Sequence, residues 1–145
     1  MGRRILIADD SITIQKVVEL TFSEPGDVVV CAGNGAQAQQ KLSQEPPDIA
    51  LLDVIMPEGG GYELCARIRK DPRTSWMPVL LLSGTFEPFD EARAREAGAD
   101  GHIKKPFESR ALTAKVEELL AARPRPGAPP REARPAPAPA AVQPP

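Results

Sequence analysis

Short apolar runs alternate with longer amphipathic segments along the first 121 residues of the chain. The runs are continuously apolar, whereas a strand with one exposed face shows alternating polar and apolar residues. Continuous runs are typical of strands that are buried on both faces of a sheet. They predict five strands, at residues 4–8, 28–31, 49–52, 79–82 and 101–103.

The segments between these runs have the periodicity of helices. One helix face is marked by Ile14, Val17, Val18 and Phe22, and the last helix is marked by Leu112, Val116, Leu119 and Leu120. Another helix is predicted over residues 90–97, with Gly98 as its C-terminal stop. Because the inward positions of that helix are only alanines, we expect it to pack loosely and to move easily.

The strict alternation of five strands with five helices predicts an α/β fold, in which a parallel sheet is covered by helices on both faces. In such sheets, functional groups gather beyond the carboxyl ends of the strands. The polar residues at these places are Asp9, Asp10, Asp53, Ser83 and Lys105. We therefore expect three carboxylates, a hydroxyl and an ammonium group to meet at one edge of the sheet.

Three clustered carboxylates need a positive charge among them. At about 5 Å and an effective dielectric constant near 20, each pair repels by roughly 3 kcal/mol. A site of carboxylate oxygens suits Mg²⁺, which keeps several waters and binds readily beside phosphoryl groups. The alternative is that Asp9 and Asp10 only cap the helix that starts near Ser11. The presence of Asp53 and Lys105 at matching strand ends favours the metal site.

Composition narrows the class of protein. Hydrophobic residues make up 41% and charged residues 26% of the chain, as in soluble folded proteins. No apolar run approaches the roughly 18 residues of a membrane-spanning helix, and the N-terminus does not resemble a secretory signal. The two cysteines, Cys31 and Cys65, are too few for a disulfide framework or a zinc site. These features predict a cytoplasmic protein that does not bind a membrane.

Charge divides the chain into two parts. Residues 1–121 carry 14 basic and 19 acidic side chains, and this acidic balance argues against binding to nucleic acid. Residues 122–145 contain nine prolines and seven alanines, with four arginines and one glutamate. This segment has too little apolar surface to fold, so we predict one domain at 1–121 and a disordered Pro/Ala-rich tail at 122–145. Such a tail could present a proline-rich ligand to a partner protein.

Four segments together resemble the receiver domain of two-component response regulators, such as chemotaxis regulators. They are Ile5-Leu6-Ile7-Ala8-Asp9-Asp10, Leu51-Leu52-Asp53-Val54-Ile55-Met56-Pro57, Leu82-Ser83-Gly84 and Lys105-Pro106-Phe107. The resemblance extends over residues 3–121 and includes the family's spacing, with 30 residues from Asp53 to Ser83 and 52 from Asp53 to Lys105. It implies a doubly wound (βα)5 flavodoxin-like fold, whose five-stranded parallel sheet has the order 2-1-3-4-5.

The resemblance also implies a phosphorylation site. Asp53 would accept a phosphoryl group from a histidine kinase or a phosphotransfer protein. Asp10 would bind Mg²⁺ directly and Asp9 would bind it through water, with Asp53 and the backbone carbonyl of Ile55 as further ligands. The function implied is signalling, with no enzyme activity beyond the domain's own phosphorylation and dephosphorylation.

Three further site residues follow from the same resemblance. Lys105 would pair with the acids at rest and with the phosphate afterwards. Ser83 would hydrogen-bond a phosphoryl oxygen. Pro106 would follow a cis peptide bond that directs Lys105 inward.

The resemblance implies that output goes through the fourth helix, the fifth strand and the fifth helix to a downstream protein partner. His102 and Lys104 lie on that strand. His102 departs from the family, which usually has Tyr or Phe three residues before the lysine and uses it as a switch. A half-exposed histidine without a switching role is the alternative. Residues 80–90 and 104–109 are also similar to receivers of polarity and motility regulators of gliding bacteria, which carry a proline-rich region.

Three other functions compete with a phosphorylated receiver. The first is a receiver that binds partners constitutively and is not phosphorylated in the cell. The second is a phosphatase of the aspartyl-phosphate type, which would have a second aspartate where this chain has Ile55. The third is a flavin-binding redox module, whose phosphate would be repelled by Asp9 and Asp10.

Overall fold

The computed structural model describes residues 3–56, 60–84 and 89–122 of the 145-residue chain. Five parallel strands form one sheet, in the order β2-β1-β3-β4-β5. The strands are β1 Arg4–Ala8, β2 Val28–Ala32, β3 Ile49–Asp53, β4 Val79–Ser83 and β5 Gly101–Lys104. Both the parallel sheet and its strand order confirm the predicted flavodoxin-like fold.

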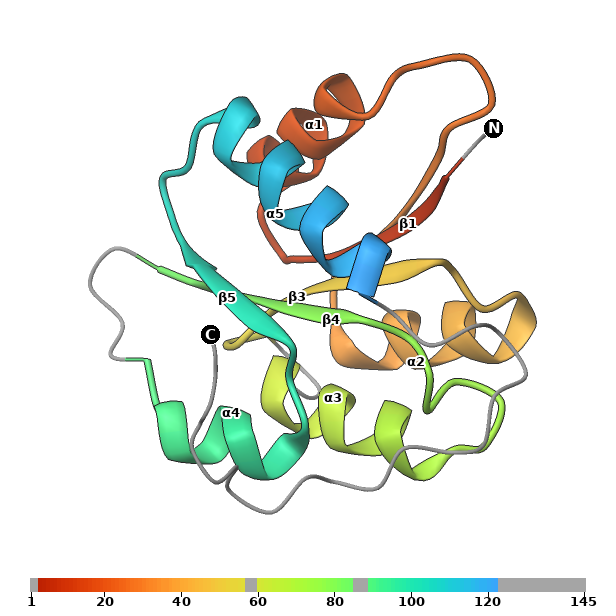
Figure 1. Cartoon of the computed structure of the whole chain (residues 1–145), viewed down its shortest axis with the longest axis vertical. Coiled ribbons are helices and arrows are strands. Elements are labelled where there is room, and N and C mark those ends of the chain that lie inside the picture. The colour runs from red at the N-terminus through yellow and green to blue at the C-terminus, as the bar shows by residue number, and fades with distance from the viewer. Residues whose placement is uncertain (1–2, 57–59, 85–88, 123–145) are drawn as a thin grey trace.

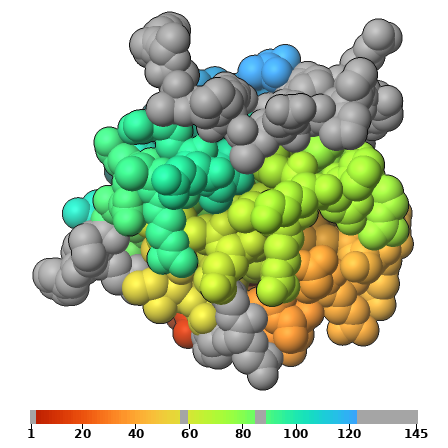
Figure 2. All heavy atoms as spheres, turned by 90° about the horizontal axis from the view of Figure 1, so that it is seen from below, coloured from red at the N-terminus to blue at the C-terminus, as the bar shows by residue number. Residues whose placement is uncertain are grey.

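Five helices within the described residues alternate with these strands. They are α1 Ile12–Thr21, α2 Gly35–Gln44, α3 Gly61–Lys70, α4 Glu91–Ala97 and α5 Ser109–Ala122. Helices α1 and α5 lie on one side of the sheet, and α2, α3 and α4 lie on the other (Figure 1). The surface seen from below is formed by α2, α3 and α4 in turn (Figure 2).

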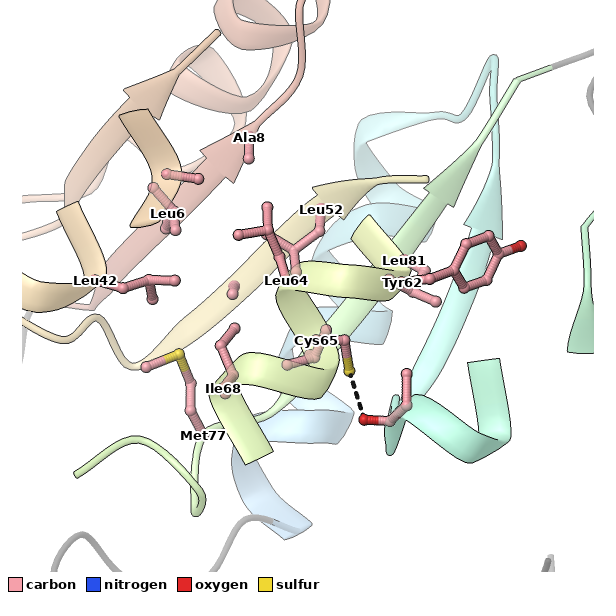
Figure 3. Packing of buried hydrophobic residues seen from close by; sticks show 14 of the residues in the cluster. Leu6, Ala8, Leu42, Leu52, Tyr62, Leu64, Cys65, Ile68, Met77 and Leu81 are labelled. Atoms are coloured by element: carbon pink, nitrogen blue, oxygen red, sulfur yellow. Dashed lines mark hydrogen bonds between the residues drawn. The ribbon is translucent and has the colours of Figure 1, made fainter. Parts of the chain in front are cut away.

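Alternate side chains of the central strands supply two hydrophobic cores. Ile5 and Ile7 of β1 face α1 and α5, in a cluster with Val18 and Val116. Leu6 and Ala8 face the other side, in a second cluster, part of which is shown in Figure 3. Both faces of the central strands are therefore apolar, which explains the continuous hydrophobic runs in the sequence.

The sequence predicted that all five strands are buried on both faces, and the two outer strands are less buried than that. Strands β3 and β4 are buried along their whole length. Strand β2 is half-buried in its middle, exposed at its first residue and buried at its last, and β5 alternates between half-buried and exposed positions. Each outer strand has a neighbour on one side only, so the sheet shields it less. The four strands after β1 also run one residue further than predicted, which adds Asp53 and Ser83 to strand ends.

Helix α4 is attached to α3 by polar contacts that its sequence does not reveal. Only Ala94 and Ala97 of α4 are buried, as predicted. However, the Cys65 thiol donates to the carbonyl of Ala97 at 3.3 Å (dashed line in Figure 3), and the Arg69 Nε donates to that of Gly98 at 2.9 Å. The expectation of loose packing overlooked these bonds, because it considered apolar side chains alone.

Parts of the sequence predictions lie outside the described residues. These parts are Pro57, the segment between Gly84 and Phe89, and the proline-rich segment from residue 123 onward. Helix α5 includes Ala122, one residue beyond the predicted domain boundary. Within the described ranges, the helices are too short or too polar to cross a membrane.

Candidate phosphorylation and metal site

The sheet places three of the predicted site residues at the carboxyl ends of its strands. Asp53 is the last residue of β3, Asp9 directly follows β1, and Lys105 directly follows β5. Strands β1 and β3 are paired, with Ala8 opposite Leu52, so Asp9 and Asp53 lie side by side at the carboxyl edge.

The carboxylates form one cluster. Asp9, Asp10 and Asp53 each offer an oxygen, and these three atoms lie within 4.8 Å of one another. Asp9 and Asp53 are buried, whereas Asp10 is exposed to solvent. The cluster thus has two shielded acids at its base and one acid at its open side.

Lys105 supplies the positive charge that the cluster needs. Its Nζ lies 2.8 Å from Asp9 Oδ2 and 3.1 Å from Asp53 Oδ2. The peptide bond between Lys105 and Pro106 is cis, and the Lys105 N–H donates to the carbonyl of Ser83 at 2.8 Å. These features bring the ammonium group back over the ends of β1 and β3.

Backbone N–H groups fix the second oxygen of each buried acid. Asp9 Oδ1 accepts from the N–H of Ser11 at 2.9 Å, and Asp53 Oδ1 accepts from the N–H of Ile55 at 3.2 Å. Each bond spans two residues, as in the turns that aspartate commonly forms. The two carboxylates are therefore oriented before any ligand binds.

The site changes the protonation of its own groups. Burial, and then the charge of Asp9, raises the pKa of Asp53 to about 6, against the opposing effects of the Ile55 N–H and Lys105. Burial alone would lower the pKa of Lys105, but hydrogen bonds and charges from Asp9 and Asp53 raise it overall. At neutral pH, Asp53 is mainly ionised and Lys105 is charged.

The loop after β3 is held close to the start of α3 by two glycines. A Cβ added to Gly60 would lie 2.2 Å from the carbonyl oxygen of Val54, and one added to Gly61 would lie 2.7 Å from that of Asp53. No side chain fits at either place. These two glycines thus allow α3 to begin directly against the backbone of Asp53.

The donor atoms of this site suit a hard cation. The cluster offers carboxylate oxygens only, two buried and one open to water. Mg²⁺ prefers such oxygen ligands and keeps several of its waters. Asp9, Asp10 and Asp53 therefore could hold Mg²⁺.

Ser83 and the residues of the predicted output surface occupy different places. Ser83 ends β4 beside Lys104 and is buried. His102 and Lys104 are exposed on the outer strand β5. The imidazole of His102 stacks on the ring of Phe89, with 4.0 Å between ring centroids and 18° between ring planes. His102 thus faces α4 and the surface and takes no part in the acid cluster.

The comparison with known proteins agrees with this geometry. The sequence profile of the response regulator receiver domain matches residues 5–117. The chain belongs to this family. Its receiver domain is therefore a signalling domain of the kind found in two-component systems.

Relatives of this receiver domain share its sequence and its fold. It is 36% identical over 119 residues to the transcriptional regulatory protein GltR of Pseudomonas aeruginosa, which covers 82% of this chain and 49% of GltR. The chain spans about half the length of the curated relatives that it matches.

Two solved structures show the same architecture. The receiver domain of a signal transduction histidine kinase from Syntrophus aciditrophicus is 36% identical, with a TM-score of 0.74 over 82% of this chain and 90% of the other. The chemotaxis response regulator CheY4 of Vibrio cholerae is 28% identical, with a TM-score of 0.75 over 82% of this chain and 99% of the other.

Sequence patterns alone did not indicate two residues that shape the receiver's site and its surroundings. The side-chain amide of Gln15 donates to the backbone carbonyl of Asp9 at 2.8 Å. Tyr62 accepts from the N–H of Asp90 through its hydroxyl at 2.9 Å, at the start of α4. Gln15 and Tyr62 belong to none of the four segments that carry the family resemblance, so no motif pointed to either residue.

Proposed function

We propose that this receiver domain is a phosphoacceptor in a two-component phosphorelay, with Asp53 as the residue that takes the phosphoryl group. The observation that carries the proposal is the placement of the Asp53 carboxylate. It is buried at the end of a central strand, within 4.8 Å of two other acids and 3.1 Å from a lysine ammonium group.

The transfer exchanges one bond to phosphorus for another. An ionised Asp53 oxygen attacks the phosphorus of a phosphohistidine, the P–N bond breaks, and a P–O bond forms on the aspartate. With a pKa of about 6, Asp53 is mostly ionised at neutral pH and can act as the nucleophile. The Ile55 N–H donates to Asp53 Oδ1 at 3.2 Å. This bond fixes the carboxylate so that its other oxygen is the one that attacks the phosphohistidine.

The remaining residues hold the charges that accompany the transfer. Asp9, Asp10 and Asp53, with the carbonyl of Ile55, would hold Mg²⁺, which when bound neutralises charge on phosphoryl oxygens. Lys105 already lies 3.1 Å from Asp53 and would pair with the phosphate after transfer. Ser83, buried at the end of the adjacent strand β4, would donate its hydroxyl hydrogen to a phosphoryl oxygen.

The proposed partners follow from this role. A histidine kinase or a phosphotransfer protein supplies the phosphoryl group in the cytoplasm, and a downstream protein reads the surface of α4, β5 and α5. Exposed His102 and Lys104 belong to that surface. An acidic domain of this kind is not expected to bind nucleic acid by itself.

Intact-mass spectrometry with a small-molecule phosphodonor tests the proposal. The wild-type chain should gain one phosphoryl group in the presence of Mg²⁺, and Asp53→Asn should gain none. Asp71→Asn, which changes an aspartate in the loop after α3, is the matched control and should be labelled like the wild type. Full labelling of Asp53→Asn would refute the assignment, and absence of labelling in all three proteins would favour a constitutive interaction domain.

A further inference from the structure

Gln15 connects the first helix to the acid cluster. It lies in the first turn of α1, and its Nε2 donates to the backbone carbonyl of Asp9 at 2.8 Å. Gln15 is half-buried, so this bond is partly shielded from water. The bond spans six residues and is separate from the hydrogen-bond ladder of the helix.

The other polar groups of Asp9 have partners too. Its N–H donates to the carbonyl of Ala32 at 3.0 Å, its Oδ1 accepts from the N–H of Ser11 at 2.9 Å, and its Oδ2 pairs with Lys105 at 2.8 Å. Gln15 adds the partner for the Asp9 carbonyl. Asp9 is therefore fixed at both its backbone and its side chain.

Fixing that carbonyl also fixes the next residue. The C=O of Asp9 and the N–H of Asp10 belong to one planar peptide unit, so holding the oxygen sets the orientation of the whole unit. Asp10 is exposed, and the side chains around it do not enclose it. The direction in which its carboxylate enters the cluster thus depends on the peptide that Gln15 holds.

We propose that Gln15 is a positioning residue for Mg²⁺ binding, because it orients the Asp9–Asp10 peptide and thereby the open carboxylate of the cluster. This inference rests on the proposed metal site of the receiver. Partners that orient metal ligands typically contribute a factor of about 10–100 to metal affinity. Since Gln15 acts through one peptide unit, we expect the lower end, roughly a tenfold change.

Mg²⁺ titration of the full chain by calorimetry measures this effect. Gln15→Met has a similar length but no amide, and Gln15→Ala removes the amide and favours helix. Both should bind Mg²⁺ about tenfold more weakly than the wild type, with melting temperatures close to wild type. Gln40→Met, an exposed position on α2, is the control and should bind Mg²⁺ as the wild type does.

Amide NMR without metal provides a second readout. The Asp10 amide signal should shift or broaden in Gln15→Met and Gln15→Ala, but not in Gln40→Met. Wild-type Mg²⁺ affinity in both Gln15 variants would overturn the role of Gln15 and leave the proposed metal site intact. No Mg²⁺ binding by the wild type would instead overturn the metal site itself, and the role of Gln15 with it.

Discussion

Asp53, the proposed phosphoacceptor, carries its charge in a position that lowers the stability of the fold. The residue is only 3% exposed and its carboxylate lies beside the buried Asp9, so the charge is poorly solvated and is repelled. Lys105 and the Ile55 N–H offset part of this cost. A neutral side chain at position 53 would make the fold more stable.

The raised pKa of Asp53 predicts how stability depends on pH. Between the unfolded pKa near 4 and the folded pKa of about 6, the folded state binds more protons than the unfolded state. The contribution of Asp53 to stability is therefore greatest at low pH and declines as the pH rises through this window. Without metal, Asp53→Asn should be more stable than the wild type by about 1–3 kcal/mol at pH 7.

Chemical denaturation of the metal-free proteins from pH 4 to pH 8 measures this difference. The advantage of Asp53→Asn should shrink as the pH falls from about 6 to 4. Asp71→Asn is the control with the opposite sign, because Arg73 lowers the pKa of Asp71 and so the charged form is favoured in the folded state. An Asp53→Asn protein that is less stable than wild type at pH 7 would contradict this account.

At the scale of elements, a buried arginine joins α3 to its neighbours. The guanidinium of Arg69 donates to the carbonyls of Gly98 and Met77 at 2.9 and 2.6 Å and pairs with Asp100. Asp100 also accepts from the N–H of Val79, the first residue of β4, at 2.9 Å. The end of α4 and the starts of β4 and β5 thus meet at one ion pair.

Replacing this arginine should lower the free energy of unfolding much more than replacing an exposed arginine. Arg69→Met keeps the apolar part of the side chain but leaves Asp100 charged without its guanidinium partner. We expect a loss of about 3–5 kcal/mol in the free energy of unfolding. Arg67→Met, two residues earlier on the exposed side of α3, should change it by less than about 0.5 kcal/mol. Equal stabilities of the two variants in urea would show that the buried pair is not important.

The contacts of α4 also suggest how phosphorylation would be read. Ser83 precedes the segment that ends at Phe89, and Phe89 stacks on His102 of β5 and lies 6.1 Å from the ring of Tyr62. Lys105 directly follows β5, the strand that carries His102. A phosphoryl group that draws Ser83 and Lys105 toward Asp53 would therefore act on the chain before Phe89 and on the strand that carries its stacking partner. The bonds between α3 and α4 make α4 more firmly held than its alanines suggest, so we expect the change at its N-terminal end and at β5.

Amide NMR with beryllium fluoride and Mg²⁺ tests this readout. Residues 89–104, including His102, should shift in the wild type, and Ser83→Ala should reduce those shifts. Coupling of this kind is worth about 1–3 kcal/mol, or a 5- to 150-fold change in partner affinity. Asp53→Asn is the control and should not respond. Shifts restricted to the neighbours of Asp53 would contradict a signal that passes through α4 and β5.

For the whole molecule, sequence patterns were sufficient wherever burial was complete. The central strands are apolar on both faces, so their runs predicted the sheet, and the sheet then placed Asp9, Asp53 and Lys105 together. The hydrophobic pattern was less informative about the outer strands of the sheet and about the polar contacts between helices and strands. The partial exposure of β5, the bonds of Arg69 and the contact from Gln15 to Asp9 depend on distant parts of the chain. Polar side chains of this kind leave no periodic signal in the sequence.

The central claim is that the phosphoryl group is attached to Asp53, and chemical trapping tests it most directly. Borohydride reduces an acyl phosphate on aspartate to homoserine, which peptide sequencing by mass spectrometry locates to a single residue. After treatment with phosphodonor and Mg²⁺, homoserine should appear at position 53 and at no other aspartate, and omission of Mg²⁺ should greatly reduce it. Homoserine at Asp9 or Asp10, or none at position 53 in a protein that has gained a phosphoryl group, would contradict the account.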